Sequence, residues 1–293
     1  MSSRSDRPRR RRRHLVLALT AAVALAGCAD AARTTPSLST PSPSDRSSDT
    51  APPVALPPAG GRLDYQLGGA YPPAGPVQTV VRDRAASPDP DRYSVCYVNA
   101  FQTQPGDREL WPDDTLLRRD GRVVTDPDWP DEVLLDTSSE TRRERIAAVL
   151  VPWVEGCAED GYDAVELDNL DSYTRSGGAL EQQDNVALAR RLVDAAHAKG
   201  LAVGQKNAAE DSEALREGAG FDFAVVEECA AYRECGTYEE VYGDRVLDIE
   251  YADNLPRTFA AMCADETSPR SMVLRDRDLE PAGSPGHVVR VCR

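Results

Sequence analysis

The chain has 293 residues, 41% of them apolar and 28% charged, and a formal net charge of −15 at pH 7. This length leaves room for one large α/β domain or two small ones. The acidic balance argues against nucleic acids and other polyanions as partners, and it either favours cationic partners or serves solubility alone.

The first 28 residues have the features of a bacterial export signal. Residues 9–13 are five arginines, residues 15–26 are mostly apolar, and residues 25–28 read LAGC. These three parts, in this order, are typical of a signal peptide, and the apolar run is too short for a mature transmembrane helix. The last four residues resemble a lipobox, which implies a lipid anchor on Cys28 at the outer face of the cell membrane. An ordinary secretory signal is the alternative.

Residues 29–61 are rich in Ser, Thr, Pro and Ala and hold few large apolar side chains. This composition is typical of a disordered tether that lifts a domain away from a membrane. The remaining residues, 62–293, are predicted to form the folded domain. Without the signal segment the formal net charge changes from −15 to −21, so the exported part is strongly acidic.

Short β-rich segments and helical segments follow one another along this domain. Their alternation predicts parallel strands, and eight strands in about 230 residues favour a (β/α)₈ TIM-type barrel. A doubly wound sheet is the alternative, but no glycine-rich phosphate loop follows the first strand. The strands are predicted at residues 63–67, 94–99, 132–136, 164–169, 202–207, 223–228, 246–250 and 272–275, and the helices at residues 140–157, 185–199 and 255–263.

Acidic side chains follow one face of two predicted strands. Glu166 and Asp168 alternate with apolar residues on the fourth strand, and Asp248 and Glu250 do so on the seventh. A buried acid is costly unless it is paired or used in chemistry. Because a barrel keeps its active residues at the carboxyl ends of its strands, these acids indicate an active site.

Two carboxylates suffice for glycoside hydrolysis, in which one donates a proton and the other acts as nucleophile or activates water. Asp168 on the fourth strand and Glu227 on the sixth are the candidates, and the adjacent Glu228 is able to exchange roles with Glu227. The domain has two histidines, His197 and His287, and neither is well placed for a nucleophilic triad. We therefore expect a two-carboxylate mechanism without a cofactor.

Six cysteines remain after Cys28, and their even number in an exported domain predicts three disulfides. Cys229 and Cys235 are the first expected pair, because they close a short loop. No C-x-x-C pair is present, so we expect no metal site.

Six short stretches, taken together and in order, resemble glycoside hydrolase family 114, the endo-α-1,4-polygalactosaminidase-like proteins. The resemblance implies a TIM-type barrel that cleaves α-1,4-linked galactosamine polymers. It implies that Asp168 is the nucleophile and Glu227 the acid/base residue, with Val226 where the family has asparagine. The stretches are residues 64–67 (DYQL), 96–100 (CYVNA), 165–171 (VELDNLD), 204–207 (GQKN), 227–229 (EEC) and 249–251 (IEY).

The implied substrate is a cationic amino-sugar polymer, in agreement with the acidic domain. Lys206, one of two lysines in the chain, is expected to pair with Asp168 or Glu166 and to keep a carboxylate ionised. Three tyrosines are expected either to pack on sugar faces or only to line the rim: Tyr65, Tyr173 and Tyr251. The full set of predicted substrate-binding residues is Tyr65, Asn99, Glu166, Asp171, Tyr173, Lys206, Glu250 and Tyr251.

The sequence therefore predicts an exported, monomeric glycoside hydrolase, tethered to the membrane through Cys28. A carbohydrate-binding lipoprotein that has kept the barrel and lost turnover is the alternative. Carboxylates at both expected catalytic positions favour the enzyme.

Overall fold

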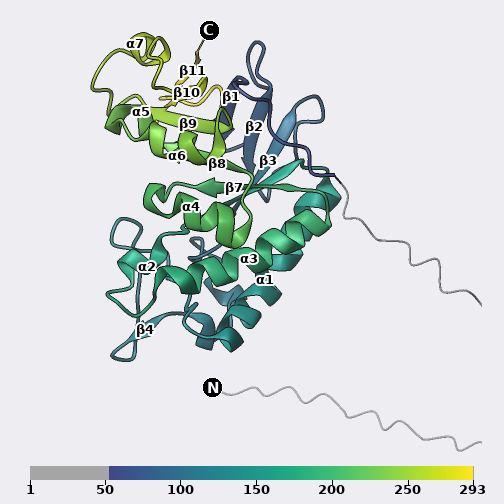
Figure 1. The fold of residues 1–293 in the computed structure, drawn as a ribbon, viewed down its shortest axis with the longest axis vertical. Helices are drawn as coiled ribbons and strands as arrows, with labels where there is room; N and C mark the ends of the chain where they lie inside the picture. The colour runs from purple at the N-terminus through teal and green to yellow at the C-terminus, as the bar shows by residue number, and fades with distance from the viewer. Residues whose placement is uncertain (1–52, 293) are drawn as a thin grey trace, which may run out of the picture. The chain divides into compact units, whose positions relative to one another are not determined.

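The computed structural model describes residues 53–292, whose central feature is a sheet that curls almost completely into a barrel (Figure 1). Eight parallel strands follow one another in chain order, and β11 adds antiparallel to β10. β1 also lies beside β10, where Asp64 and Arg275 are 3.8 Å apart, so the sheet nearly closes. The strands are β1 (Leu63–Gln66), β2 (Thr79–Asp83), β3 (Tyr93–Asn99), β6 (Ala164–Asp168), β7 (Ala202–Lys206), β8 (Phe223–Glu227), β9 (Val246–Tyr251), β10 (Ser271–Arg275) and β11 (Val289–Val291).

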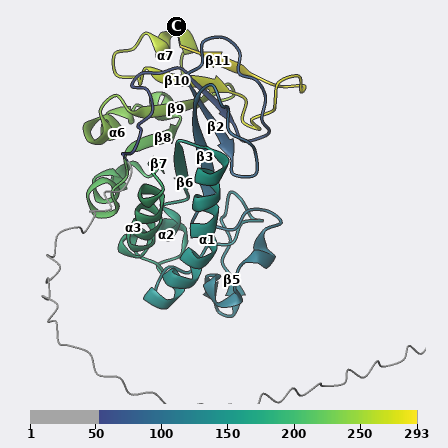
Figure 2. The same ribbon diagram turned by 90° about the vertical axis from the view of Figure 1, so that its right-hand side faces the viewer.

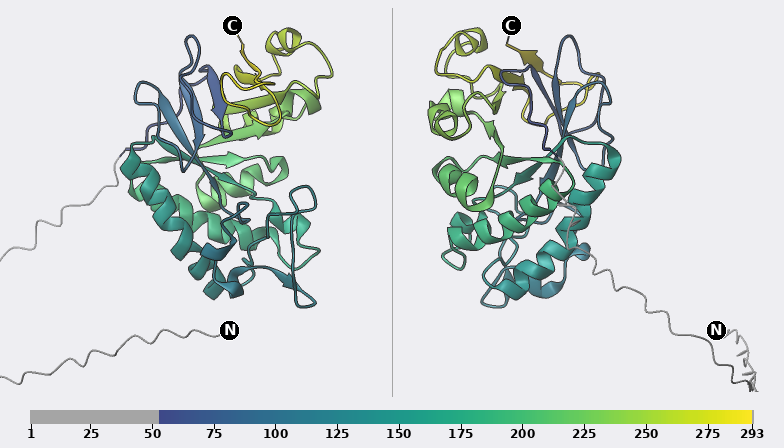
Figure 3. Two further views of the ribbon diagram at one scale, coloured as in Figure 1. Left: turned by 180° about the vertical axis from the view of Figure 1, so that it is seen from behind. Right: turned by 45° about the vertical axis from the view of Figure 1, so that its right-hand side comes forward.

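Helices connect the parallel strands from β3 onward and pack outside the barrel, where α1 (Glu140–Asp160) and α3 (Gln182–Ala198) lie side by side (Figure 2). The β1–β2 and β2–β3 connections contain no helix, so the barrel lacks its first two helices (Figure 3). The shorter helices are α2 (Ser172–Arg175), α4 (Ser212–Ala214), α5 (Cys229–Tyr232), α6 (Cys235–Tyr242) and α7 (Phe259–Cys263). A hairpin of β4 (Arg118–Arg119) and β5 (Arg122–Val123) lies in the long loop after β3.

The two long helices begin and end where the sequence supplies caps. The Ser139 hydroxyl accepts a hydrogen bond from the Arg142 backbone N–H, which satisfies one free donor at the start of α1. Gly161 ends α1 with a φ of 95°, a left-handed conformation that glycine adopts without strain. Glu181 and Asp184 form a reciprocal capping box at the start of α3.

Side chains alternate between the barrel interior and the helix side along each strand. On β6, Val165 and Leu167 pack toward the helices, whereas Ala164 lies in the interior cluster. Gly204 on β7 has no room for a side chain, because a Cβ atom there would lie 2.7 Å from the Phe223 ring. This close-packed interior forms a floor beneath the last residues of the strands.

The predicted barrel is confirmed, although one predicted strand is wrong and one of the eight parallel barrel strands is absent from the prediction. Residues 132–136 lie in the loop before α1, where Leu134 forms only an isolated bridge with Gln102. The segment resembles a strand because Leu134 and Leu135 are fully buried, but it is buried within the loop. The parallel strand that the prediction lacks is β2, whose charged end (RD, residues 82–83) obscures its alternation.

The predicted signal segment, Cys28 and most of the predicted tether lie outside the described residues. Residues 53–61, at the end of the predicted tether, contact the barrel: the Tyr93 hydroxyl donates to the Ala55 carbonyl at 2.8 Å, and the Gly60 N–H donates to the Asp244 backbone carbonyl at 3.3 Å. Between residues 53 and 292, no helix has the length and apolar character needed to cross a membrane.

All six cysteines of the domain are joined in three disulfides. Cys96 on β3 is bonded to Cys157 in α1. The two cysteines are 61 residues apart, and their bond fixes the helix to the sheet. The bond that the sequence suggested first, Cys229 to Cys235, closes a loop of only 6 residues after β8. The third bond joins Cys263 to Cys292 near the C-terminus.

We predict that the long-range disulfide contributes more to stability than the short one. Replacing Cys96 and Cys157 by alanine is expected to lower the free energy of unfolding by about 4 kcal/mol, because a long loop is released in the unfolded chain. The matched change at Cys229 and Cys235, which are equally buried, is expected to lower it by about 2 kcal/mol. Guanidinium denaturation measures both losses, and equal values would contradict the chain-entropy explanation.

Candidate active site

A cleft of about 330 Å³ opens at the carboxyl ends of the barrel strands, where barrel enzymes keep their active sites. Six acidic and three basic side chains line it. The acidic residues are Asp126, Asp128, Glu132, Asp168, Asp171 and Glu227, and the basic residues are Arg175, Lys206 and Arg277.

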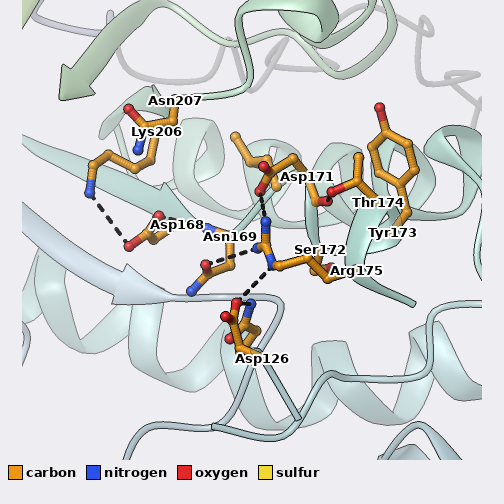
Figure 4. Close-up of polar contacts among 12 residues, drawn as sticks. Asp126, Asp168, Asn169, Asp171, Ser172, Tyr173, Thr174, Arg175, Lys206 and Asn207 are labelled. Atoms are coloured by element: carbon orange, nitrogen blue, oxygen red, sulfur yellow. Dashed lines mark hydrogen bonds and ion pairs between the residues drawn. The ribbon is translucent and has the colours of Figure 1, made fainter. Parts of the chain in front are cut away.

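Three adjacent strands place one lysine between two carboxylates. Asp168, Lys206 and Glu227 are the last residues of β6, β7 and β8, which pair in that order. The Lys206 Nζ atom lies 3.5 Å from Oδ2 of Asp168, as Figure 4 shows, and 3.4 Å from Oε2 of Glu227. The structure therefore brings together the two carboxylates that the sequence predicts to be catalytic.

Asp168 is held by donors on both of its oxygens. The Tyr97 hydroxyl donates to Oδ2 at 2.7 Å, and the Asn169 backbone N–H donates to Oδ1 at 2.7 Å. Burial raises the pKa of Tyr97 well above its ordinary value, and the Asp168 charge adds to this, so the hydroxyl keeps its proton as a donor. These contacts fix the carboxylate in one orientation.

Glu227 is held in a similar way on the opposite side of Lys206. The Tyr251 hydroxyl donates to Oε1, and the Asn207 amide donates to Oε2 at 2.9 Å. Burial raises the pKa of Glu227, but Lys206, Tyr251 and Asn207 together outweigh burial and hold this pKa below its ordinary value. The free cleft therefore stabilises Glu227 as a carboxylate.

A third carboxylate lies beneath Lys206 rather than in the cleft. Glu166 is fully buried, 3.4 Å from the Lys206 Nζ atom, and it accepts a hydrogen bond from the Tyr65 hydroxyl at 2.9 Å. Burial raises its pKa to about 7, although Lys206 opposes this rise. Glu166 was predicted to bind substrate; its position instead supports Lys206 from below.

Lys206 stays charged although its side chain is only 3% exposed. Burial alone would lower the pKa of the ammonium group, but Asp168, Glu227 and Glu166 together hold it well above its ordinary value. The Tyr65 hydroxyl, 3.2 Å from Nζ, completes its surroundings. The expected pairing of Lys206 with Asp168 or Glu166 is present with both, and it extends to Glu227.

Arg175 connects two walls of the cleft (Figure 4). Its Nε atom lies 2.7 Å from Asp126, in the loop after β3, and its Nη1 atom lies 2.9 Å from Asp171, before α2. Arg175 also donates to the Asn169 side chain at 3.2 Å. Asp171, predicted to bind substrate, lines the cleft, with part of its charge neutralised by this arginine.

Two other predicted contacts, Asn99 and Tyr173, do not line the cleft. Asn99 is 2% exposed, and it donates to Glu132 at 2.9 Å and accepts from Asn169 at 3.0 Å, so it orients residues of the lining. The Tyr173 hydroxyl donates to Asp211 at 2.9 Å, away from the cleft. Tyr65 and Tyr251, in contrast, both line it.

Glu250 lies on the opposite side of β9 from the cleft. Its position therefore does not agree with the predicted contact between Glu250 and substrate. Leu247, Ile249 and Tyr251 belong to the barrel interior, which directs Asp248 and Glu250 toward the helices. Glu250 accepts hydrogen bonds from the Ala230 and Ala231 N–H groups at 2.9 and 3.1 Å, at the start of α5. The buried side chains of Asp248 and Glu250 therefore fix the turn that directly follows Glu227.

The same turn distinguishes Glu227 from its neighbour. Glu228 adopts a φ of 61°, which directs its side chain away from the cleft lining. Its carboxylate is held by Arg277 at 2.9 Å and by the Asn254 amide at 2.9 Å. The position of Glu227 in the cleft therefore favours it over Glu228 as the partner of Asp168.

Several cleft residues are absent from the sequence prediction. Asp126, Asp128, Trp129 and Glu132 all come from the long loop after β3, where residues follow no strand or helix period. The available signal is the acid-rich run DPDWPDE at residues 126–132, with a tryptophan between two prolines. Burial raises the pKa of Glu132 to about 7, with the Asn99 amide opposing the rise.

Comparisons with known proteins agree with this fold. The family model described as glycoside-hydrolase family GH114 matches residues 43–293. Aspergillus fumigatus Ega3, solved in complex with galactosamine, is similar in fold, with a TM-score of 0.66 and 23% identity over 82% of this chain and 98% of that chain. The glycoside hydrolase domain of Pseudomonas aeruginosa PelA is similar in fold too, with a TM-score of 0.55 and 15% identity over 76% of this chain and 97% of that chain. A search of the curated proteins finds no match.

Proposed function

The chain belongs to glycoside hydrolase family GH114, and from its cleft we propose that it cleaves a polysaccharide of α-1,4-linked galactosamine with Asp168 and Glu227. The observation that carries the proposal is the pair of carboxylates held on either side of Lys206 at the open end of the barrel. The galactosamine bound in the structure of Ega3 supports the choice of sugar.

In the proposed reaction, Asp168 attacks the anomeric carbon while Glu227 gives a proton to the departing glycosidic oxygen. Glu227 then takes a proton from water, which attacks the same carbon and releases Asp168. Both carboxylate oxygens lie within 3.5 Å of one nitrogen, so they are at most about 7 Å apart. This limit includes the spacing of retaining enzymes, about 5–5.5 Å, and excludes most of the inverting range.

The charge of the cleft supports an amino-sugar substrate. Six carboxylates line the cleft, and each of its three basic side chains already lies within 3.5 Å of an acid. The lining therefore keeps a negative excess, which attracts a polymer with free amino groups. Lys206 is too buried to bind the substrate by itself, and its role is to fix both carboxylates.

Asp168→Asn is expected to reduce cleavage of an α-1,4-galactosamine polymer by about a hundredfold or more, because an amide is a poor nucleophile. The measurement is the release of reducing ends, with circular dichroism to verify folding. Asp83→Asn is the matched control, since Asp83 also ends a barrel strand but does not line the cleft. Full activity in Asp168→Asn would remove Asp168 from the mechanism, and binding without cleavage by the wild type would favour a carbohydrate-binding protein.

The pH dependence of kcat/KM is expected to report the proton on Glu227, which the free enzyme must carry to act as an acid. Because the pKa of Glu227 is held below its ordinary value, kcat/KM is expected to fall as the pH rises through that acidic range. Tyr251→Phe removes one donor to the carboxylate, so the pKa rises and the fall moves to higher pH, by about one unit.

The matched control for this shift is Tyr173→Phe. The Tyr173 hydroxyl contacts Asp211 outside the cleft, so its removal is expected to leave the pH profile of kcat/KM unchanged. An unchanged profile in Tyr251→Phe would assign the fall in kcat/KM to a group other than Glu227.

We further propose that the protein is exported and held at the outer face of the membrane by a lipid on Cys28. The sequence LAGC after a basic and an apolar run supports this, as do three disulfides, which are typical of proteins outside the cytoplasm. In a bacterial host, the full chain is expected to incorporate labelled fatty acid and to sediment with membranes, and Cys28→Ser is expected to do neither. Wild-type protein without label in the soluble fraction would contradict the anchor.

A further inference from the structure

One large aromatic side chain on the cleft wall is left open to water. Trp129 is 63% exposed and lines the cleft, in the loop between β3 and α1. The other two tryptophans lie elsewhere: Trp111 is 5% exposed and packs edge-on against Trp153 at 5.6 Å. A large apolar surface kept in water beside a cleft is a feature of ligand-binding sites.

The exposure of Trp129 does not come from a loose loop. Asp126 accepts hydrogen bonds from the Asp128 and Trp129 N–H groups at 2.8 and 3.3 Å, and Arg175 fixes its carboxylate from the other side. The Trp129 carbonyl accepts from the Glu132 N–H at 2.9 Å. Proline stands directly before and after the Asp128–Trp129 pair and restricts the backbone further. The indole is therefore presented on a rigid support.

Two carboxylates that line the same cleft have no basic partner among the described residues. Asp126 and Asp171 are both paired with Arg175, whereas Asp128 and Glu132 form no ion pair with any residue between 53 and 292. The side chain of Glu132 is held by the Asn99 amide alone, at 2.9 Å, and burial raises its pKa to about 7. Both carboxylates are therefore free to pair with a cation from outside the protein.

We propose that Trp129 is the stacking platform of a substrate subsite that takes one hexosamine unit with a free amino group. The apolar face of the sugar lies on the indole, and its ammonium group faces Asp128 and Glu132. An apolar contact with the indole and a charge attraction to the two carboxylates stabilise this arrangement. The inference rests on the proposed function, because the same polymer must reach the Asp168–Glu227 pair.

Fluorescence tests the platform without turnover. In the full chain carrying Asp168→Asn, α-1,4-linked galactosamine oligomers are expected to change the tryptophan emission in a saturable way, because Trp129 is the exposed fluorophore. Adding Trp129→Phe is expected to remove most of this change, while Trp153→Phe is the matched control that keeps it. A signal that persists in Trp129→Phe overturns the inference.

Kinetics separate a binding role from a structural one. Trp129→Ala is expected to raise KM for the polymer about tenfold while kcat stays within about twofold, and Trp129→Phe is expected to recover most of the loss. Tyr232→Ala truncates an aromatic residue that is 64% exposed but does not line the cleft, and it is expected to change neither constant. An unchanged KM in Trp129→Ala overturns the platform.

The ammonium contact has its own test. Wild-type binding is expected to favour galactosamine oligomers over fully N-acetylated ones, and Asp128→Asn is expected to reduce this preference several-fold. Equal binding of both oligomers by the wild type contradicts the charge recognition. A wild type that fails to cleave the polymer but shows the Trp129-dependent signal would overturn the proposed hydrolysis and leave the subsite in place.

Discussion

The site depends on one buried ammonium group shared by three carboxylates. Lys206 is the last residue of the strand between those that carry Asp168 and Glu227, and Glu166 supports it from the barrel interior. A charge removed from water in this way is tolerable only with partners on every side, and each carboxylate in turn needs the cation. Removing the lysine would therefore leave three carboxylates close together without a cation, so the cluster depends on Lys206. The strand order β6-β7-β8 supplies the required spacing without a contribution from loops.

Much of the fold and of this cluster follows from the sequence. Alternation within residues 164–168 shows that Glu166 and Asp168 share a face, and strand ends predict where a barrel gathers its polar groups. The same pattern on β9 is misleading for Glu250. In a barrel both faces of a strand are buried, so a period of two identifies the residues that share a face but not the side to which they turn. Only the packing of Leu247 and Ile249 in the interior decides it.

The cleft wall formed by the loop after β3 cannot be predicted from the periodicity of the sequence. Its residues contact one another through single hydrogen bonds and isolated bridges, as Leu134 does with Gln102, rather than through a repeating pattern. Buried loop residues therefore resemble a strand, as residues 132–136 do, while the charged end of β2 conceals a real one. Long-range pairing, such as that of Arg175 with Asp126, leaves no periodic trace in the sequence.

Arg175 has a consequence for how relatives of this protein diverge. A single guanidinium joins segments about fifty residues apart, and both of its acidic partners have no other basic partner between residues 53 and 292. Replacing the arginine alone would leave Asp126 and Asp171 without a cation between them, and replacing either acid alone would release Arg175 from one wall of the cleft. Selection is therefore expected to preserve or exchange these three positions together, so that correlated substitution among homologues traces the outline of the cleft.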